Sequence, residues 1–229
     1  MAIVTFDFET SIYSKGNAFD YRNKAVSYSV KVNNEKTLHR RYNDIDFISL
    51  LRTSIESTKL IVGANLKFDI HWLTNLGISI PVGTRIWDVQ LAEFVLSGQT
   101  NSFASLNSLA ILYGLPTKLD EVSDYWERGV NTQDIPAEVL EEYNNYDVEL
   151  TYKVYECQQK DPRMTPELHK LIILQGLDLL VLQEMEYNGL KYDIKASKET
   201  AEKLSLELLD IDKRIDAYRD WETDRKSVV

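Results

Sequence analysis

Apolar and polar residues alternate in the first part of the chain, as they do in half-buried strands. The alternating stretches are residues 2–8, 26–32 and 36–42, and the turn-like pair Asn33-Asn34 separates the last two. Side chains along a strand point to opposite faces in turn, so this period of two predicts three consecutive strands. Strands that follow one another so closely favour an antiparallel meander.

After residue 43 the apolar residues fall at helical spacing, interrupted by short apolar runs. Helices are predicted over residues 44–57, 67–76, 89–96 and 106–113, and strands over residues 60–63 and 84–87. A longer helix is predicted to begin at Asp134-Ile135-Pro136 and to end near Gln159, because proline is tolerated in a first turn. This alternation of helix and strand predicts the α/β class with a mixed central sheet flanked by helices.

The pair Asp161-Pro162 breaks the long helix, so we expect a first domain over residues 1–162. A small helical segment should follow over residues 163–218, with one helix over 165–187 and another from 195 to about 218. Between these helices, the Asn188-Gly189 turn predicts a short strand over residues 190–193. The apolar period is lost over residues 219–229, which predicts an irregular tail: a frayed terminus, a truncation point or non-native sequence.

The composition narrows the classes of protein. The single cysteine, Cys157, cannot form an internal disulfide or a thiolate zinc site, which favours a reducing cytoplasm. No basic segment precedes Asp7, and no apolar run approaches the roughly 20 residues of a membrane span. We therefore expect a cytoplasmic chain that does not enter a membrane.

The charge balance is acidic, with 36 Asp and Glu against 26 Lys and Arg and a net charge of −10. A passive nucleic-acid binder gains affinity by neutralising phosphates with Lys and Arg, so this balance argues against that class. The acidic balance does not argue against an enzyme that binds phosphates through divalent cations. In such an enzyme the cations supply the positive charge and the protein supplies the carboxylates that hold them.

Acidic residues stand at two positions where an α/β sheet commonly binds ligands. Asp7 and Glu9 lie two apart on the first predicted strand, so their side chains share a face and could share a cation. They could also belong to the solvated face of an edge strand. Asp69 stands at the start of a helix after the strand 60–63, where it could bind a ligand or simply complement the helix dipole. Asn65 could be an N-cap.

A third motif lies on the long helix, where Tyr143 and Asp147 are four residues apart and share one face. That spacing alone is common on surface helices. Combined with the strand pair and Asp69 in this order, it indicates a single carboxylate-lined site.

The three motifs, Asp7-Phe8-Glu9, Asn65-Leu66-Lys67-Phe68-Asp69 and Tyr143-x-x-x-Asp147, resemble the exonuclease motifs of the DEDD superfamily, tyrosine subtype. More closely, the chain resembles the 3′–5′ proofreading exonuclease domain of family A DNA polymerases of bacteria and phages. Supporting stretches are residues 87–92, 105–110 and Ile135-Pro136. The resemblance covers roughly residues 1–160 and implies a ribonuclease H-like fold, in a bacterial or phage-infected cell.

The resemblance continues over residues 181–193, which look like the segment where such polymerases enter the polymerase domain. It implies that residues 163–218 are the start of that domain; an exposed amphipathic hairpin is the structural alternative. The motifs that carry nucleotide addition are absent from this sequence, so no synthesis is expected.

The resemblance also implies two divalent cations, Mg²⁺ or Mn²⁺, which prefer oxygen ligands. Asp7 would bridge both ions, Glu9 and Asp147 would complete the water-activating site, and Asp69 would act mainly on the second ion. Tyr143 would orient the attacking water.

The same resemblance assigns DNA-binding roles. Thr10 would contact the 3′-hydroxyl, Tyr13 would wedge against the terminal bases, and Asn65 would hold the strand. Tyr13 departs from the family pattern, since the bacterial enzymes often have an aliphatic residue there. Tyr125-Trp126 could be a second stacking element or part of the core.

We therefore expect a monomeric exonuclease that releases 5′-nucleoside monophosphates from single-stranded DNA 3′ ends and proofreads beside the remainder of a DNA polymerase. Three alternatives stay open. They are an RNA-trimming exonuclease with the same acids, a catalytically inactive wall of a polymerase, and an acidic protein-interaction module.

Overall fold

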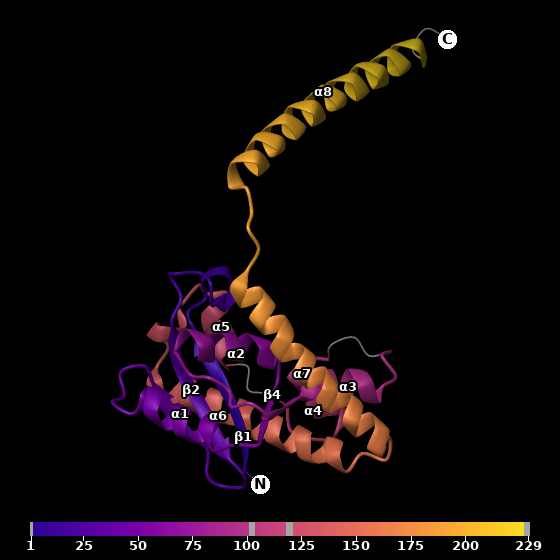
Figure 1. The fold of residues 1–229 in the computed structure, drawn as a ribbon. Helices are drawn as coiled ribbons and strands as arrows, with labels where there is room; N and C mark the ends of the chain where they lie inside the picture. Colours follow the sequence, from indigo (N-terminus) through magenta and orange to yellow (C-terminus); the bar gives the residue numbers. More distant parts are fainter. Residues whose placement is uncertain (1, 101–103, 118–120, 227–229) are drawn as a thin grey trace. The chain divides into compact units, whose positions relative to one another are not determined.

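The computed structural model describes residues 2–100, 104–117 and 121–226 (Figure 1). Its chain forms two compact units, Met1–Tyr187 and Asn188–Val229. The first unit contains the sheet and all the predicted site residues.

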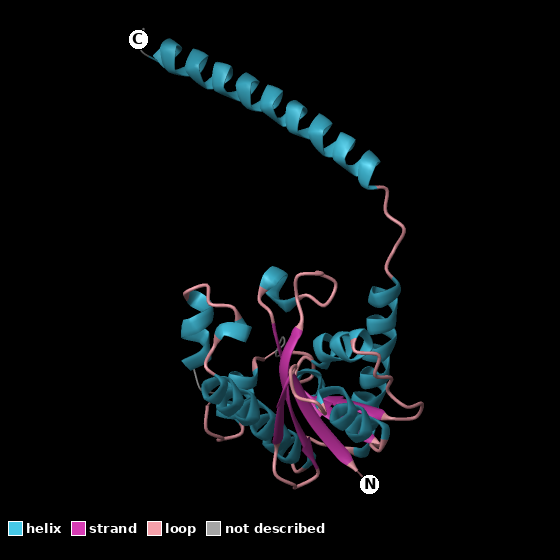
Figure 2. Ribbon diagram, turned by 90° about the vertical axis from the view of Figure 1, so that its left-hand side faces the viewer, coloured by secondary structure: helices cyan, strands magenta, loops and turns pink. Residues whose placement is uncertain are grey.

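The first unit is built on a five-stranded sheet with the strand order β3-β2-β1-β4-β5. Helices flank its strands, which are magenta in Figure 2. The strands are β1 (Ile3–Thr10), β2 (Ala25–Val32), β3 (Leu38–Arg41), β4 (Leu60–Gly63) and β5 (Arg85–Asp88). β1, β2 and β3 pair antiparallel in succession, whereas β4 lies parallel to β1 and β5 parallel to β4. The expected meander and the mixed sheet are confirmed.

Helices follow the strands as the apolar spacing predicts. They are α1 (Phe47–Glu56), α2 (Leu66–Asn75), α3 (Val89–Leu96), α4 (Leu106–Leu112), α5 (Glu121–Glu127), α6 (Ala137–Gln159) and α7 (Pro166–Asn188). α5 and two 3-10 turns, η1 (Tyr13–Gly16) and η2 (Thr132–Asp134), were not predicted. These elements have at most seven residues, too few to show an apolar period.

The two faces of β1 are covered by different helices, because its side chains alternate. Val4, Phe6 and Phe8 are buried in a core with residues of α1 and α2, such as Leu51 and Ile70. The odd positions of β1 therefore lie on the opposite face. That face is packed by α6, which contacts β1, β2 and β4. Asp7 and Glu9 are thus directed towards the helix that carries Asp147.

Almost all of helix α7 belongs to the first compact unit, which therefore continues past Asp161-Pro162. A Cβ added at Gly176 of α7 would lie 2.3 Å from the backbone oxygen of Ile86 on β5, which is too close for a real Cβ atom, so the two backbones approach closely only because residue 176 is glycine. Arg163, which precedes α7, places Nη1 2.9 Å from Glu93 Oε1 on α3. The first unit continues to Tyr187 because these close contacts extend beyond the helix break.

The second unit consists of a connecting segment and the helix α8 (Ile194–Lys226). No strand forms over residues 190–193, where Leu190 is 95% exposed, so the predicted strand there is wrong. The predicted irregular tail is also wrong as far as Lys226, because α8 continues through Arg219, which pairs with Asp216 at 2.8 Å. Good helix formers such as Arg and Lys extend a helix without apolar residues. Residues 227–229 lie outside the described part.

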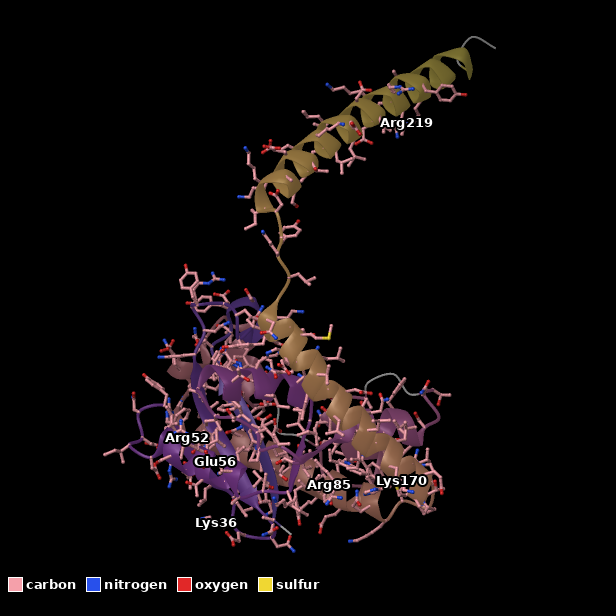
Figure 3. All side chains as sticks on the ribbon, in the orientation of Figure 1. Lys36, Arg52, Glu56, Arg85, Lys170 and Arg219 are labelled. Carbon is pink, nitrogen blue, oxygen red and sulfur yellow. The ribbon has the colours of Figure 1, made fainter. Side chains whose placement is uncertain are left out.

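The side chains of α8 stand away from the helix up to Arg219 and are almost all exposed (Figure 3). The exposed side chains include an apolar series at helical spacing: Leu204, Leu208, Ile211 and Ile215. Among the helices of the described residues, none is long and apolar enough to cross a membrane.

Candidate functional site

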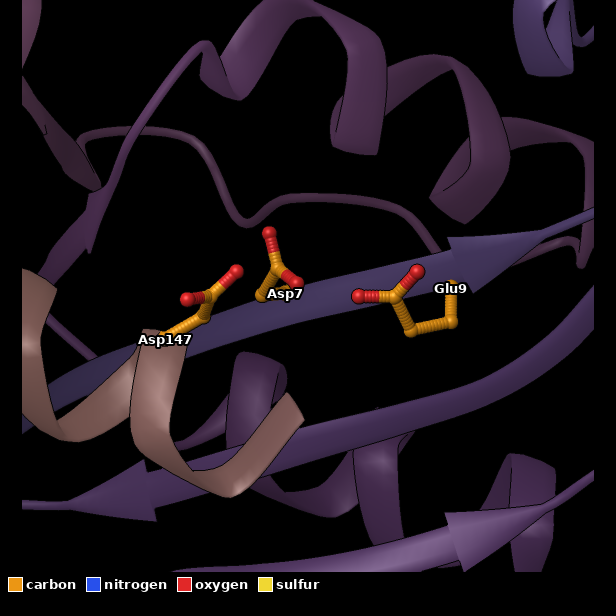
Figure 4. A group of neighbouring side chains, drawn as sticks. All are labelled: Asp7, Glu9 and Asp147. Carbon is orange, nitrogen blue, oxygen red and sulfur yellow. The ribbon is translucent and has the colours of Figure 1, made fainter. Parts of the chain in front are cut away.

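Three carboxylates meet between the sheet and α6. Asp7 and Glu9 from β1 and Asp147 from α6 each offer an oxygen, and these atoms lie within 4.8 Å of one another (Figure 4). Glu9 and Asp147 are buried and Asp7 is half-buried. The strand pair and the helix motif are therefore brought together, as the sequence predicts.

The geometry follows from local structure. The strand period aims Asp7 and Glu9 at the same face, and α6 crosses that face. The pairing of β1 with β2 shifts register between Glu9 and Thr10, an irregularity of the kind that re-aims side chains beside functional sites. Asn144 on α6 donates from Nδ2 to Asp7 Oδ2 at 2.8 Å and lies 3.3 Å from the Asp7 backbone oxygen. These contacts join β1 to α6 at the cluster.

Asp69 on α2 lies beside the same cluster. Its Oδ1 accepts a hydrogen bond from the Phe8 backbone N–H at 3.0 Å, which ties α2 to the strand between Asp7 and Glu9. Burial first, and then the carboxylate of Asp7, raise the pKa of Asp69 well above its usual range, although the Phe8 bond opposes them. The carboxylates of Asp7 and Glu9 therefore act on Asp69 and also meet Asp147 in the cluster.

The start of α2 is fixed by Asp88, a residue to which the sequence analysis assigned no role. Asp88 Oδ2 accepts from the Leu66 N–H at 2.7 Å, and Oδ1 accepts from the Gln90 and Leu91 N–H groups at 2.9 and 3.2 Å. Burial raises the pKa of Asp88. One carboxylate thus caps α3 and holds the first residue of the helix that carries Asp69. Its position at the end of a predicted strand was the available signal.

Tyr143 lies one turn before Asp147 and is buried. Its ring packs edge-on against Trp126 with a centroid separation of 5.7 Å and an interplanar angle of 90°. Trp126 Nε1 donates to Thr132 Oγ1 at 3.1 Å. Tyr143 is therefore held within a small core that includes Val26 and Leu140.

A cavity of about 410 Å³ opens beside the carboxylates and is lined by Glu9, Thr10, Phe68 and Trp126 among others. Thr10 is nearly buried here, and its Oγ1 lies 3.2 Å from the Ser11 backbone oxygen. Trp126 of the aromatic pair Tyr125-Trp126 packs in the core and also lines this cavity. Tyr125 is partly buried in the same core.

Tyr13 and Asn65 lie outside that cavity lining. Tyr13 is 43% exposed in η1, and the Arg22 guanidinium lies 4.8 Å from its ring centroid. Asn65 precedes α2 in the left-handed conformation, with φ 58°, and its side chain makes no capping hydrogen bond to that helix. It lines a second cavity of about 290 Å³ with Lys67 and Gln90. The structure therefore brings Thr10 beside Glu9 at the cavity, whereas the side chains of Tyr13 and Asn65 are not part of its lining.

The donor set fits a hard divalent cation. The cluster offers carboxylate oxygens and no imidazole or thiolate, which is the ligand chemistry that Mg²⁺ and Mn²⁺ prefer. Burial, and after it the carboxylate of Asp7, raise the pKa of Asp69, and a cation beside these acids would favour their ionised forms. Asp7, Glu9 and Asp147 are the residues placed to hold it.

Comparisons with known proteins agree with this geometry. Residues 1–161 match the model of a 3′-5′ exonuclease family, DNA_pol_A_exo1. DNA polymerase DpoZ of Acinetobacter phage SH-Ab 15497 is 24% identical over 170 residues, which are 67% of this chain and 26% of that polymerase. The chain thus spans about a quarter of the length of this curated relative.

Solved structures resemble the fold at low sequence identity. Brucella melitensis NrnC bound to pGG has a TM-score of 0.60 at 14% identity, with 84% of this chain and 89% of that chain covered. The same protein with bound Mg²⁺ has a TM-score of 0.56 at 14% identity, with the same coverage. The catalytic core of RRP6 from Trypanosoma brucei has a TM-score of 0.51 at 14% identity, covering 79% of this chain and 46% of that chain. These matches confirm the ribonuclease H-like exonuclease fold.

Proposed function

The chain belongs to the 3′-5′ exonuclease family of the DEDD type, and from this premise we propose that it shortens DNA strands from the 3′ end with two divalent cations. The observation that carries the proposal is the meeting of Asp7, Glu9 and Asp147, whose oxygens lie within 4.8 Å of one another. Asp69, coupled to the same acids, completes the metal-binding set.

Asp7 lies between Glu9 and Asp147 in Figure 4, and of the neighbouring carboxylates it raises the pKa of Asp69 most. We assign it to both cations, Glu9 and Asp147 to the first, and Asp69 to the second. When bound, the cations would supply the charge that lowers the pKa of a water molecule and neutralises the departing 3′-oxygen. The released product would be a 5′-nucleoside monophosphate.

The remaining residues would place the strand. The cavity beside Glu9 and Thr10 is proposed to take the terminal nucleotide, with Thr10 at the 3′-hydroxyl and Trp126 against a base. Tyr143 would hold the attacking water through its hydroxyl. Tyr13 and Asn65 are proposed to contact the next nucleotides.

DNA is the proposed substrate because the sequence relative is a phage DNA polymerase. We place the activity in proofreading, with residues 163–218 as the beginning of a polymerase domain and the remainder of that polymerase as the partner. The chain is proposed to act as a monomer in the cytoplasm. An RNA-trimming activity at the same acids is the competing substrate assignment, and a parallel assay separates the two.

The proposal is tested with a 5′-labelled single-stranded oligonucleotide, supplied as DNA and as RNA of the same sequence. Mg²⁺ or Mn²⁺ should produce a descending ladder of DNA products and free 5′-nucleoside monophosphates, and EDTA should stop the reaction. Faster shortening of the RNA than of the DNA would make RNA the substrate instead. Products that shorten from the labelled end, or activity unaffected by EDTA, would overturn the polarity or the metal requirement.

A further inference from the structure

Asn144 is a buried asparagine that interacts directly with the proposed metal site. Its side chain is fully buried on α6, between Tyr143 and the turn that carries Asp147. Nδ2 donates to Asp7 Oδ2 at 2.8 Å and lies 3.3 Å from the Asp7 backbone oxygen. A single amide therefore contacts both the side chain and the main chain of one proposed metal ligand.

The chemistry of the two partners fixes which way this amide points. A carboxylate and a carbonyl oxygen only accept hydrogen bonds, so the NH₂ end of Asn144 must face Asp7 and the oxygen must point away. The oxygen, Oδ1, is buried and has no hydrogen-bond partner of ordinary geometry among the described residues, and the same holds for Nε2 of His39 on β3. The Asn144 amide raises the pKa of His39, against the stronger lowering by burial.

His39 is itself held in place. Its Nδ1 lies 3.1 Å from Ser29 Oγ on β2, and that hydroxyl is 2.8 Å from Asn145 Oδ1 on α6. His39 and Ser29 lie opposite each other in the β2–β3 pairing. These contacts join β2 and β3 to Asn145, the neighbour of Asn144 on α6.

We propose that Asn144 is a positioning residue, which fixes the carboxylate of Asp7 in the orientation that binds the cation. This inference rests on the proposed metal-dependent function. Hydrogen-bond partners of metal ligands orient them before the metal arrives, and losing one typically costs about 10- to 100-fold in metal affinity or activity. With Oδ2 of Asp7 held by an amide, the carboxylate cannot turn freely, so less order has to be gained on binding.

The neighbouring Asn145 provides a matched control. It is the same residue type on the same helix, but its side chain accepts a hydrogen bond from Ser29 rather than contacting an acid of the cluster. Loss of Asn145 should affect stability through Ser29 and leave the orientation of Asp7 unchanged.

The experiment is a titration of the full chain with Mn²⁺ by calorimetry, together with melting in EDTA. Asn144→Ala removes the donor, and Asn144→Leu removes it while keeping a similar volume, so at least one should keep the fold. We expect the Mn²⁺ dissociation constant to rise about 10-fold in both and less than twofold in Asn145→Ala. Wild-type affinity in a folded Asn144 variant would overturn the positioning role.

A measurement on the wild-type chain needs no variant. The side-chain NH₂ resonances of Asn144 should be protected from exchange with water and should shift when Mg²⁺ is added, more than those of Asn145. A freely exchanging amide that does not respond to Mg²⁺ would also overturn the proposal. If the wild-type chain binds neither Mg²⁺ nor Mn²⁺, the proposed function fails instead, so the two failures are distinguishable.

Discussion

Two groups of buried acidic side chains occur in the first unit, and their surroundings shift pKa values in opposite directions. In the site group, burial and the neighbouring carboxylates raise the pKa of Asp69. In the other group, Asp161 and Glu93 meet Arg163, whose hydrogen bond lowers the pKa of Asp161. Arg163 lies 2.6 Å from Asp161 Oδ2 and 2.9 Å from Glu93 Oε1.

This difference separates an ion-paired cluster from the cluster proposed to bind metal. Around Arg163, the protein supplies the guanidinium that neutralises its acids, and the result joins α3 to the segment before α7. Around Asp7, acids stand beside acids, which disfavours their ionised forms and would favour a bound cation. Removing a member should therefore weaken the fold in the Arg163 group and the chemistry in the site group.

The largest expected effect is on catalysis. Asp7→Ala and Asp147→Ala should each lower the rate of strand shortening by at least about 1000-fold, which is about 4 kcal/mol of barrier. Their melting temperatures in EDTA should equal or exceed that of the wild type, because each variant removes one of several repelling charges. Single-turnover assays beside melting curves check both parts. A large drop in melting temperature would make the acid structural.

The second effect is on stability. Arg163→Leu leaves the carboxylates of Glu93 and Asp161 buried without their guanidinium and should destabilise the fold by about 2 to 3 kcal/mol. This is less than for a fully buried pair, since the Arg163 side chain is 40% exposed.

Urea unfolding measures that loss, and activity per folded molecule should stay at the wild-type level. Lys203→Ala, which removes an exposed pair with Glu207 on α8, is the control and should change stability by less than about 0.5 kcal/mol. An Arg163→Leu variant as stable as this control would show that the Arg163 group does not support the fold.

Tyr143→Phe should have a smaller effect. The ring would still pack against Trp126, but the hydroxyl proposed to hold the water would be lost. We expect a fall of about 10-fold in the single-turnover rate, or about 1.4 kcal/mol, with an unchanged Mn²⁺ titration midpoint. An unchanged rate would remove Tyr143 from the catalytic set and leave it as a packing residue beside Asp147.

The smallest effect concerns Asp69 without metal. Because its folded pKa is raised, Asp69 favours folding while protonated, and this contribution is lost as pH rises through the folded pKa. Asn stays neutral and its oxygen can still accept from the Phe8 N–H. Asp69→Asn should therefore raise the melting temperature at neutral pH by about 2 to 4 °C, or about 1 kcal/mol, and by less at low pH. In EDTA, a variant less stable at every pH would contradict the assigned pKa direction.

Much of the fold was predictable because its pattern is local. The strand period of residues 2–8 predicted β1, and the helical spacing before Gln159 predicted α6. The extent of the first unit was not predictable, because the role of Gly176 depends on its close approach to Ile86 of a distant strand. Likewise, residues 190–193 have apolar residues typical of a strand, but no neighbouring strand pairs with them among the residues that the structure describes.

The acids of the site were also predictable, because their residue types and order are visible in the sequence. Asn144 was not assigned a role, although it stands inside the quoted motif. Its function depends on a hydrogen bond to a residue 137 positions earlier, which only the packing of α6 on β1 creates. Asp88 was missed for a similar reason, as its hydrogen bond to Leu66 joins segments 22 residues apart.

The difference between the two acidic groups is tested most directly by melting the protein with increasing Mn²⁺. A ligand that binds only the folded state at 100 times its dissociation constant adds about 2.7 kcal/mol, which for a chain of this size is a rise of roughly 5 to 10 °C. Wild type and Arg163→Leu should both show this rise, and Asp7→Ala should not. No rise in the wild type, or an equal rise in Asp7→Ala, would contradict the assignment of Asp7, Glu9 and Asp147 as the metal site.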